Sequence, residues 1–281
     1  MDNRLIRKAY KMIHKNKKLI YQSIKSRKTR PSILFIVGCQ RSGTSMLLNV
    51  LDRDLNTRCF GEFSSLTSND IRSGIRLNSL DLVKKEFSQV TAPLIVAKPL
   101  VESQNICELL DYFENSTAVW IFRNYRDVAL SNVRKFGPNN ALDDLRPIVN
   151  GDPTNWRSEK VSRYVQDKIS EHFFPEMNPY DAAVLFWFAR NHIFFDLELD
   201  RNPRIAIFSY DALVLEPQRY LRSIYRQVRQ AYPKIDMTTE IHAHSKNRGK
   251  DISLSPEVEQ LAQELEDKLE VAHRTTFLPY L

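Results

Sequence analysis

The chain has 281 residues, 42% of them hydrophobic and 27% charged, which is enough for one sizeable core. Its three cysteines, Cys39, Cys59 and Cys107, are scattered without a CxxC pair, which speaks against a disulfide framework or a zinc site and favours a reducing compartment. The net charge of +7 is uneven, because residues 1–30 carry +10 and residues 31–281 carry −3, so we expect no nucleic-acid binding by the folded part.

The first predicted element is a basic helix within residues 1–30. Its apolar residues recur at steps of three and four, opposite a lysine-rich face. They are Leu5, Ile6, Ala9, Met12, Ile13, Leu19, Ile20 and Ile24. Such a helix can make a peripheral contact with an anionic membrane surface, or it can pack on the protein's own surface with its charges solvated, which is the commoner case. No apolar run reaches the about 20 residues of a membrane span, and no signal peptide is evident, so we expect a cytoplasmic protein.

Residues 31–281 are predicted to form a single domain in which short apolar runs alternate with longer helical stretches. The runs with the composition of buried strands are residues 33–37, 94–97, 119–122 and 205–208. The stretches with helical periodicity are residues 45–54, 103–113, 126–134 and 217–230. This alternation predicts an α/β fold, a P-loop-type parallel sheet covered by helices on both faces. Binding sites in such folds lie at the carboxyl ends of the strands.

Residues 137–179 interrupt this pattern. They are rich in turn dipeptides and have little periodicity, so we expect an irregular segment of the kind that forms lids or binding loops. Residues 181–196 are apolar nearly all round, which predicts a buried helix. A last helix is expected to begin near Pro256.

The most informative motif directly follows the first predicted strand. Its sequence, Gly-Cys-Gln-Arg-Ser-Gly-Thr-Ser from Gly38 to Ser45, has the spacing of a phosphate-binding loop. Gly38 and Gly43 allow the backbone to wrap around an anion, with N–H groups of the first helical turn pointing at it. Thr44 stands where nucleoside triphosphatases have a lysine, and Arg123 stands where they have an aspartate that helps hold magnesium. The loop therefore favours a nucleotide with separated anionic groups and no metal.

Two motifs resemble those of sulfotransferases that use 3'-phosphoadenosine 5'-phosphosulfate (PAPS) as the donor. One is Arg-Ser-Gly-Thr-Ser at residues 41–45, and the other is Arg-Asn-Tyr-Arg-Asp-Val-Ala-Leu-Ser at residues 123–131. In that family the first motif holds the 5'-phosphosulfate, which implies this role for Arg41, Ser42, Gly43, Thr44 and Ser45. The second motif holds the 3'-phosphate, which implies that Arg123 and Ser131 contact it. After transfer, the nucleotide product would be 3'-phosphoadenosine 5'-phosphate (PAP).

The layout is most similar to that of the tyrosylprotein sulfotransferase branch. In that branch a loop arginine, a glutamate after the first helix and a lysine ending the second strand are catalytic, which implies these roles for Arg41, Glu62 and Lys98. Lys135 falls where the branch has a further cation for the 3'-phosphate, and Tyr210 matches a tyrosine that contacts the adenine. The resemblance covers roughly residues 32–250.

Towards its end the resemblance loosens. Lys246-Asn247-Arg248-Gly249-Lys250 only loosely echoes the Arg-Lys-Gly loop of the cytosolic enzymes, and within it we single out Arg248 as a contact of the 3'-phosphate. Those cytosolic enzymes also place a catalytic histidine after the strand lysine, where this chain has Pro99.

The implied reaction moves a sulfuryl group to an acceptor hydroxyl. Glu62 would take the proton from that hydroxyl, while Arg41 and Lys98 would stabilise charge on the leaving oxygen. The alternatives are a P-loop kinase, against which Thr44 and Arg123 count, and a binding module without activity. For the acceptor we favour a saccharide or glycan over a peptide tyrosine, and a lipid-linked sugar is also compatible. The sequence carries no signal for an oligomeric state.

Overall fold

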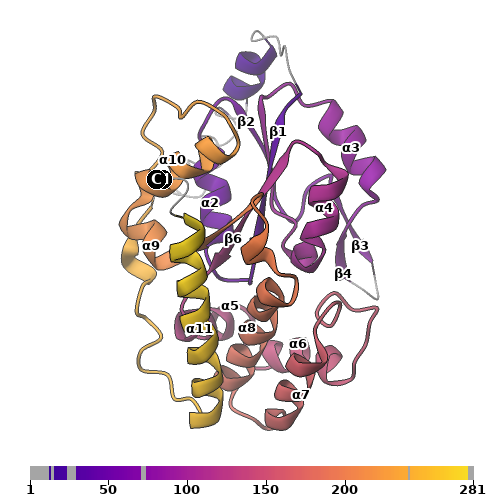
Figure 1. Cartoon of the computed structure of the whole chain (residues 1–281), viewed down its shortest axis with the longest axis vertical. Coiled ribbons are helices and arrows are strands. Elements are labelled where there is room, and N and C mark those ends of the chain that lie inside the picture. The colour runs from indigo at the N-terminus through magenta and orange to yellow at the C-terminus, as the bar shows by residue number, and fades with distance from the viewer. Residues whose placement is uncertain (1–12, 14–15, 24–29, 71–73, 240, 278–281) are drawn as a thin grey trace, which may run out of the picture.

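A five-stranded parallel sheet organises the chain in the computed structural model, which describes residues 13, 16–23, 30–70, 74–239 and 241–277 (Figure 1). The strand order is β2-β5-β1-β6-β7. The strands are β1 (Ser32–Gly38), β2 (Thr57–Phe60), β5 (Leu94–Ala97), β6 (Ser116–Phe122) and β7 (Ile205–Ser209). β1 lies at the centre and is buried along its whole length, as its β-branched and aromatic run requires. The four predicted strands are confirmed, whereas β2 was not predicted.

Helices cover both faces of this sheet, which confirms the predicted α/β fold. Alternate residues of β1 enter two different cores, with Leu34 and Ile36 on one face and Phe35 and Val37 on the other. The first core is completed by α2 (Thr44–Leu51), α9 (Tyr210–Leu215) and α10 (Pro217–Gln227). The second is completed by α4 (Ile106–Tyr112), α5 (Tyr125–Phe136), α8 (Pro179–Asp196) and α11 (Pro256–Phe277).

Residues 137–179 were predicted to be irregular, and for about half of their length this was wrong. They form α6 (Asn140–Val149) and α7 (Arg163–His172), whereas residues 137–139, 150–162 and 173–178 lack regular structure. The turn dipeptides that suggested a long loop mark helix ends instead: Gly137 caps the end of α5, and Asn178 caps the start of α8. The buried helix predicted at residues 181–196 is confirmed as α8, which packs against α5, α6, α7 and α11.

Several short elements were not predicted. β3 (Thr67–Asp70) and β4 (Gly74–Leu77) form an antiparallel pair after β2, and α3 (Leu80–Ser88) follows them. η1 (Leu100–Asn105) is a 3₁₀ helix between β5 and α4, and further 3₁₀ turns are η2 (Leu199–Arg201) and η3 (Ala243–Ser245). These elements are too short for a clear period in the sequence.

Of the predicted N-terminal basic helix, residues 16–23 are described as helical, and the rest of residues 1–30 apart from Ile13 and Arg30 lies outside the described residues. Lys18 donates to the Asp52 carboxylate at 2.6 Å and to Thr57 Oγ1 at 3.0 Å, and Gln22 Nε2 donates to the carbonyl oxygens of Leu55 and Thr57. This segment therefore docks where β2 begins. Within the described part of the chain, no helix combines the length and apolar character needed to cross a bilayer.

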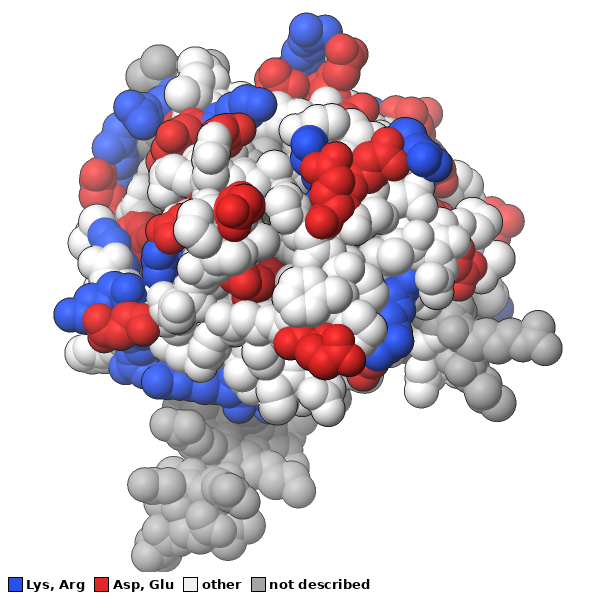
Figure 2. Space-filling view, turned by 90° about the horizontal axis from the view of Figure 1, so that it is seen from below, with Lys and Arg blue, Asp and Glu red and all other residues white. Residues whose placement is uncertain are grey.

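Charges of both signs are mixed on the face seen from below in Figure 2. This mixture agrees with the sequence, in which residues 31–281 carry 30 basic and 33 acidic side chains.

A buried hydrogen bond near the start of β2 gives a test of the fold. Tyr225 on α10 donates to Asp54 Oδ2 at 2.7 Å, and both residues are buried. Burial, and then the charge of Asp54, raise the pKa of Tyr225, so its hydroxyl stays a donor. Tyr225→Phe leaves the Asp54 carboxylate short of a partner, and we expect it to lower the free energy of unfolding by about 1–3 kcal/mol in urea titrations.

The matched control is Tyr112→Phe, because Tyr112 donates to Asp81 at the surface. Water can replace that bond, so the unfolding midpoint should hardly move. Equal effects of the two variants would contradict the role assigned to the buried pair.

Candidate active site

The glycine loop (residues 38–45) lies between β1 and α2, at the carboxyl edge of the sheet. Gly43 has φ 95°, and a Cβ atom at this position would lie 2.3 Å from the ring of Tyr210. The loop therefore closes only because residue 43 has no side chain and Tyr210 can pack directly on it. Ser42 is fully buried, and its hydroxyl has no hydrogen-bond partner among the described residues. A buried hydroxyl without a partner next to backbone N–H groups suits a bound anion.

Glu62, Lys98 and Ser45 meet beside this loop. Lys98 follows β5, and its Nζ donates to Glu62 Oε2 at 2.7 Å and to Ser45 Oγ at 3.0 Å. The Lys98 side chain is 5% exposed and that of Glu62 23%, so the pair is partly shielded and still open on the carboxylate side. The structure thus brings together three of the predicted residues, which come from three separate segments.

Arg41 turns away from this pair. It lies in the left-handed region with φ 67°, and its Nε donates to Ser131 Oγ on α5 at 3.0 Å. Its guanidinium also lies 5.8 Å from the ring centre of Phe136. Burial, and then the charge of Arg123, lower the pKa of Arg41. The side chain that was expected beside the leaving oxygen thus contacts Ser131, a predicted ligand of the 3'-phosphate.

Arg123 directly follows β6 and contacts the glycine loop, because its Nη1 donates to the carbonyl oxygen of Arg41. Its Nη2 lies 3.0 Å from Asp127 Oδ2, and its guanidinium lies 4.6 Å from the ring centre of Tyr210. It also donates to the carbonyl oxygen of Ser245, while Tyr210 OH and Ser245 Oγ are 2.6 Å apart. Arg123 Nε is buried and has no partner among the described residues, so this cation retains an unsatisfied donor.

Asp127 is a site residue that the sequence analysis did not single out. Its carboxylate accepts from the backbone N–H groups of Asn247 at 2.9 Å and Gly249 at 2.8 Å, in addition to its ion pair with Arg123. A Cβ atom on Gly249 would lie 2.3 Å from the backbone of Arg126, so residue 249 must be glycine for this contact. The only sequence signal was the i,i+4 spacing of Arg123 and Asp127.

Lys135 and Arg248 are exposed, unlike the other predicted cations of the site. Arg248 Nε donates to the carbonyl oxygen of His244 at 2.5 Å. Lys246, in the same segment, is half-buried. Asp127 attaches residues 246–250 to the site, because its carboxylate accepts from the backbone N–H groups of Asn247 and Gly249. This attachment determines where Lys246 and Arg248 lie.

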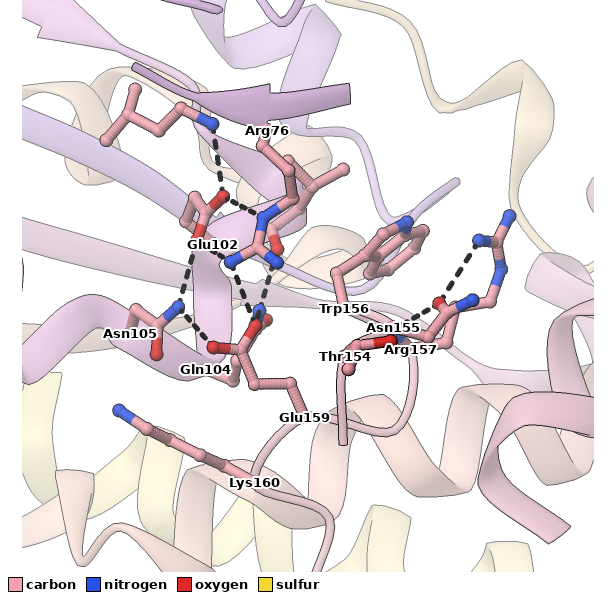
Figure 3. Close-up of polar contacts among 12 residues, drawn as sticks. Arg76, Glu102, Gln104, Asn105, Thr154, Asn155, Trp156, Arg157, Glu159 and Lys160 are labelled. Atoms are coloured by element: carbon pink, nitrogen blue, oxygen red, sulfur yellow. Dashed lines mark hydrogen bonds and ion pairs between the residues drawn. The ribbon is translucent and has the colours of Figure 1, made fainter. Parts of the chain in front are cut away.

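Figure 3 shows a partly buried polar cluster (Arg76, Glu102, Gln104, Asn105 and Glu159) that is joined by hydrogen bonds and ion pairs. Arg76 on β4 lies between the carboxylates of Glu102 and Glu159, at 2.7 and 3.0 Å. Glu102 belongs to η1, which begins two residues after Lys98, and the hairpin is tied to Glu62 because Thr67 Oγ1 donates to its carbonyl oxygen. The cluster therefore holds Glu159, near the end of the irregular residues 150–162, against β4 and η1.

The glycine loop is joined to the same region by a second chain of contacts. Gln40 donates to Asp144 Oδ2 at 3.3 Å, and Arg157 Nε donates to Asp144 Oδ1 at 2.5 Å. Burial raises the pKa of Asp144, while the charge of Arg157 opposes the shift. Residues 137–179, which the sequence predicted to form a lid or binding loop, are thus attached to the glycine loop through Asp144 and to β4 and η1 through Glu159.

Solved structures with a similar fold include sulfotransferases, whereas no family model and no curated protein matches the sequence. The sulfotransferase domain from the curacin biosynthetic pathway is 19% identical, with a TM-score of 0.48 over 86% of this chain and 99% of that one. A sulfotransferase from Alicyclobacillus acidocaldarius is 13% identical, with a TM-score of 0.47 over 89% and 96%.

A third neighbour is sulfotransferase STF9 from Mycobacterium avium, 13% identical, with a TM-score of 0.43 over 92% of this chain and 81% of that one.

The start of α5 gives a pH-dependent test of the site's framework. Asn124 caps this helix and donates to Glu266 Oε2 on α11 at 3.0 Å. Burial raises the pKa of Glu266 to about 7, with Glu270 and Asp211 adding to the shift and the Asn124 bond opposing it. The folded state therefore holds a proton that the unfolded chain has lost, so this contribution to stability disappears as pH rises through about 7.

We expect the unfolding free energy of the wild type to fall relative to that of Glu266→Gln between about pH 4.5 and 7, because the amide cannot ionise. Glu264→Gln, at an exposed position of the same helix, should follow the wild type. Parallel stability curves for the wild type and Glu266→Gln would refute the assignment.

Proposed function

We propose that the protein is a sulfotransferase that moves a sulfuryl group from PAPS to an acceptor hydroxyl. The observation that carries this proposal is the meeting of Glu62, Lys98 and Ser45 beside an anion-binding loop. A carboxylate and a cation from different segments lie 2.7 Å apart there, at the carboxyl edge of the sheet, where ligands of such folds bind.

The residues present fit a bound nucleotide with two anionic groups. The buried Ser42 hydroxyl, which has no partner in the described part of the chain, and the N–H groups at the start of α2 suit one of them, the phosphosulfate. Arg123 Nε, which likewise has no partner among the described residues, and the hydroxyl of Ser131 suit the other, the 3'-phosphate. Tyr210 packs between the loop and Arg123, in a position to contact the nucleotide base.

In the proposed reaction the donor supplies an activated sulfuryl group, and the protein supplies a base, positive charge and alignment. Glu62 accepts the acceptor's proton; Lys98 contacts only Oε2 of its carboxylate, so the reaction can use Oε1. Lys98 can then place its ammonium against the negative charge that develops on the leaving oxygen. Ser45 holds Lys98 towards the loop, and Arg41 can add a second fixed cation if it leaves Ser131.

Magnesium-dependent phosphoryl transfer is the weaker alternative. A P-loop kinase needs a lysine for the β- and γ-phosphates and an acidic ligand for the metal. Thr44, which is buried, and Arg123 occupy those two places.

For the acceptor, we infer a saccharide or glycan hydroxyl rather than a peptide tyrosine. Polar side chains are attached to η1, which follows Lys98, and to the glycine loop: Arg76 and Glu159 join Glu102, and Arg157 joins Asp144, a partner of Gln40. Arg76, Glu159 and Arg157 each keep about a quarter of their side chain exposed. Such groups can bond the several hydroxyls of a sugar. Phe63, next to Glu62, is 86% exposed and offers a flat apolar surface for a ring.

Glu62→Gln tests the catalytic role most simply. The amide keeps the shape of the side chain but cannot take a proton, so we expect kcat to fall by about 10²- to 10⁴-fold. Binding of PAP, measured by calorimetry, should change little, because Glu62 is not assigned to the nucleotide. Glu176→Gln, at an exposed site on the surface, is the control. An unchanged kcat for Glu62→Gln would remove Glu62 as the base.

An acceptor panel tests the substrate class. Wild-type protein with radiolabelled PAPS should label oligosaccharides that have free hydroxyls, and Phe63→Ala should raise KM for them without changing the affinity for PAP. Label on tyrosine peptides but never on glycans would overturn the saccharide assignment and leave the sulfotransferase proposal standing.

A further inference from the structure

The N-terminal helical segment (residue 13 and residues 16–23) has the opposite orientation to an ordinary surface helix. Its polar side chains Lys18 and Gln22 point into the protein and are buried. The side chains of Ile13 and Ile20 are 65% and 62% exposed, and Leu19 is also exposed. Ile13 and Ile20 are seven residues apart and therefore share one face, opposite Lys18 and Gln22.

The polar contacts on the inner face hold this orientation. Lys18 Nζ bonds the Asp52 carbonyl oxygen, the Asp52 carboxylate and Thr57 Oγ1, at 2.6, 2.6 and 3.0 Å. Gln22 Nε2 bonds the carbonyl oxygens of Leu55 and Thr57, at 2.8 and 2.9 Å. Rolling the helix to bury the isoleucines would break all five bonds and leave buried acceptors unpaired. The apolar face is thus directed outwards by the structure.

Charge identifies the partner of this face. Residues 1–30 carry eleven Lys and Arg against the single acid Asp2, and Lys17 is exposed beside the isoleucines. An apolar stripe within a basic segment matches a bilayer that contains anionic phospholipid, where lysines meet headgroups and apolar side chains enter the acyl boundary. A second copy of the chain would bring a segment of the same charge against it, which disfavours self-association.

We propose that the N-terminal helical segment docks the protein on an anionic phospholipid surface through Ile13, Leu19 and Ile20. The segment is attached where β2 begins, at Thr57, whereas Glu62 follows the other end of that strand. Docking therefore leaves the candidate active site at the opposite edge of the sheet from the bilayer. The segment is the indigo helix at the top of Figure 1. This inference does not depend on the proposed reaction.

Vesicle flotation with the full chain tests the proposal. We expect binding to phosphatidylcholine vesicles that contain about 30% phosphatidylserine, at least about fivefold weaker binding to phosphatidylcholine alone, and release in about 0.5 M salt. The double variant Ile13→Ser with Ile20→Ser should lower the binding constant by about tenfold or more.

The matched control is Leu82→Ser with Leu215→Ser, since these leucines are 53% and 61% exposed on α3 and α9. It should bind vesicles as the wild type does. The proposal would be overturned if the wild type showed no phosphatidylserine-dependent binding, or if both double variants lost vesicle binding to the same extent. The proposal would also be overturned if analytical ultracentrifugation showed a dimer for the wild type and a monomer for the isoleucine variant, and neither protein bound vesicles. The apolar face would then bind a second copy of the chain.

Discussion

The parallel pairing of β1 with β5 and β6 is the constraint on which the candidate site depends. In the register of the sheet, Ala97 at the end of β5 lies opposite Phe35, and Ile121 near the end of β6 lies opposite Gly38. Residues that follow these strands must therefore emerge next to the glycine loop. Lys98 and Arg123 are such residues, so two cations that are far apart in sequence lie on either side of one loop.

Two buried carboxylates extend this arrangement beyond the strand ends. Asp127 pairs with Arg123 and binds two backbone N–H groups, which draws residues 247–249 onto the start of α5. Glu102 does the equivalent on the other side, since it holds Arg76 and the backbone N–H of Leu77 against η1. A buried carboxylate persists only when its charge is matched and its oxygens are bonded, so each of them commits a surface segment to one position.

Sequence reasoning identified the strands and their following residues because buried parallel strands are continuous apolar runs. It placed Glu62, Lys98 and Ser45 in one site, and the structure joins them by hydrogen bonds. It could not predict the direction of the Arg41 side chain, which depends on the left-handed backbone at that residue and on Ser131 across the site.

The helices α6 and α7 were missed because turn dipeptides at helix ends look like those of a loop, whereas the buried side chains that hold α6 against α8 become evident only in three dimensions.

The proposed site binds a nucleotide with a 3'-phosphate and needs no metal. Calorimetry of PAP and of adenosine 5'-phosphate, each with and without magnesium, is the first measurement to make. We expect PAP to bind without metal and much more tightly than adenosine 5'-phosphate, and we expect Ser131→Ala to narrow this difference in affinity while Ser170→Ala, on α7, does not. Equal affinity for the two nucleotides, or binding of ATP only with magnesium, would contradict the proposed site.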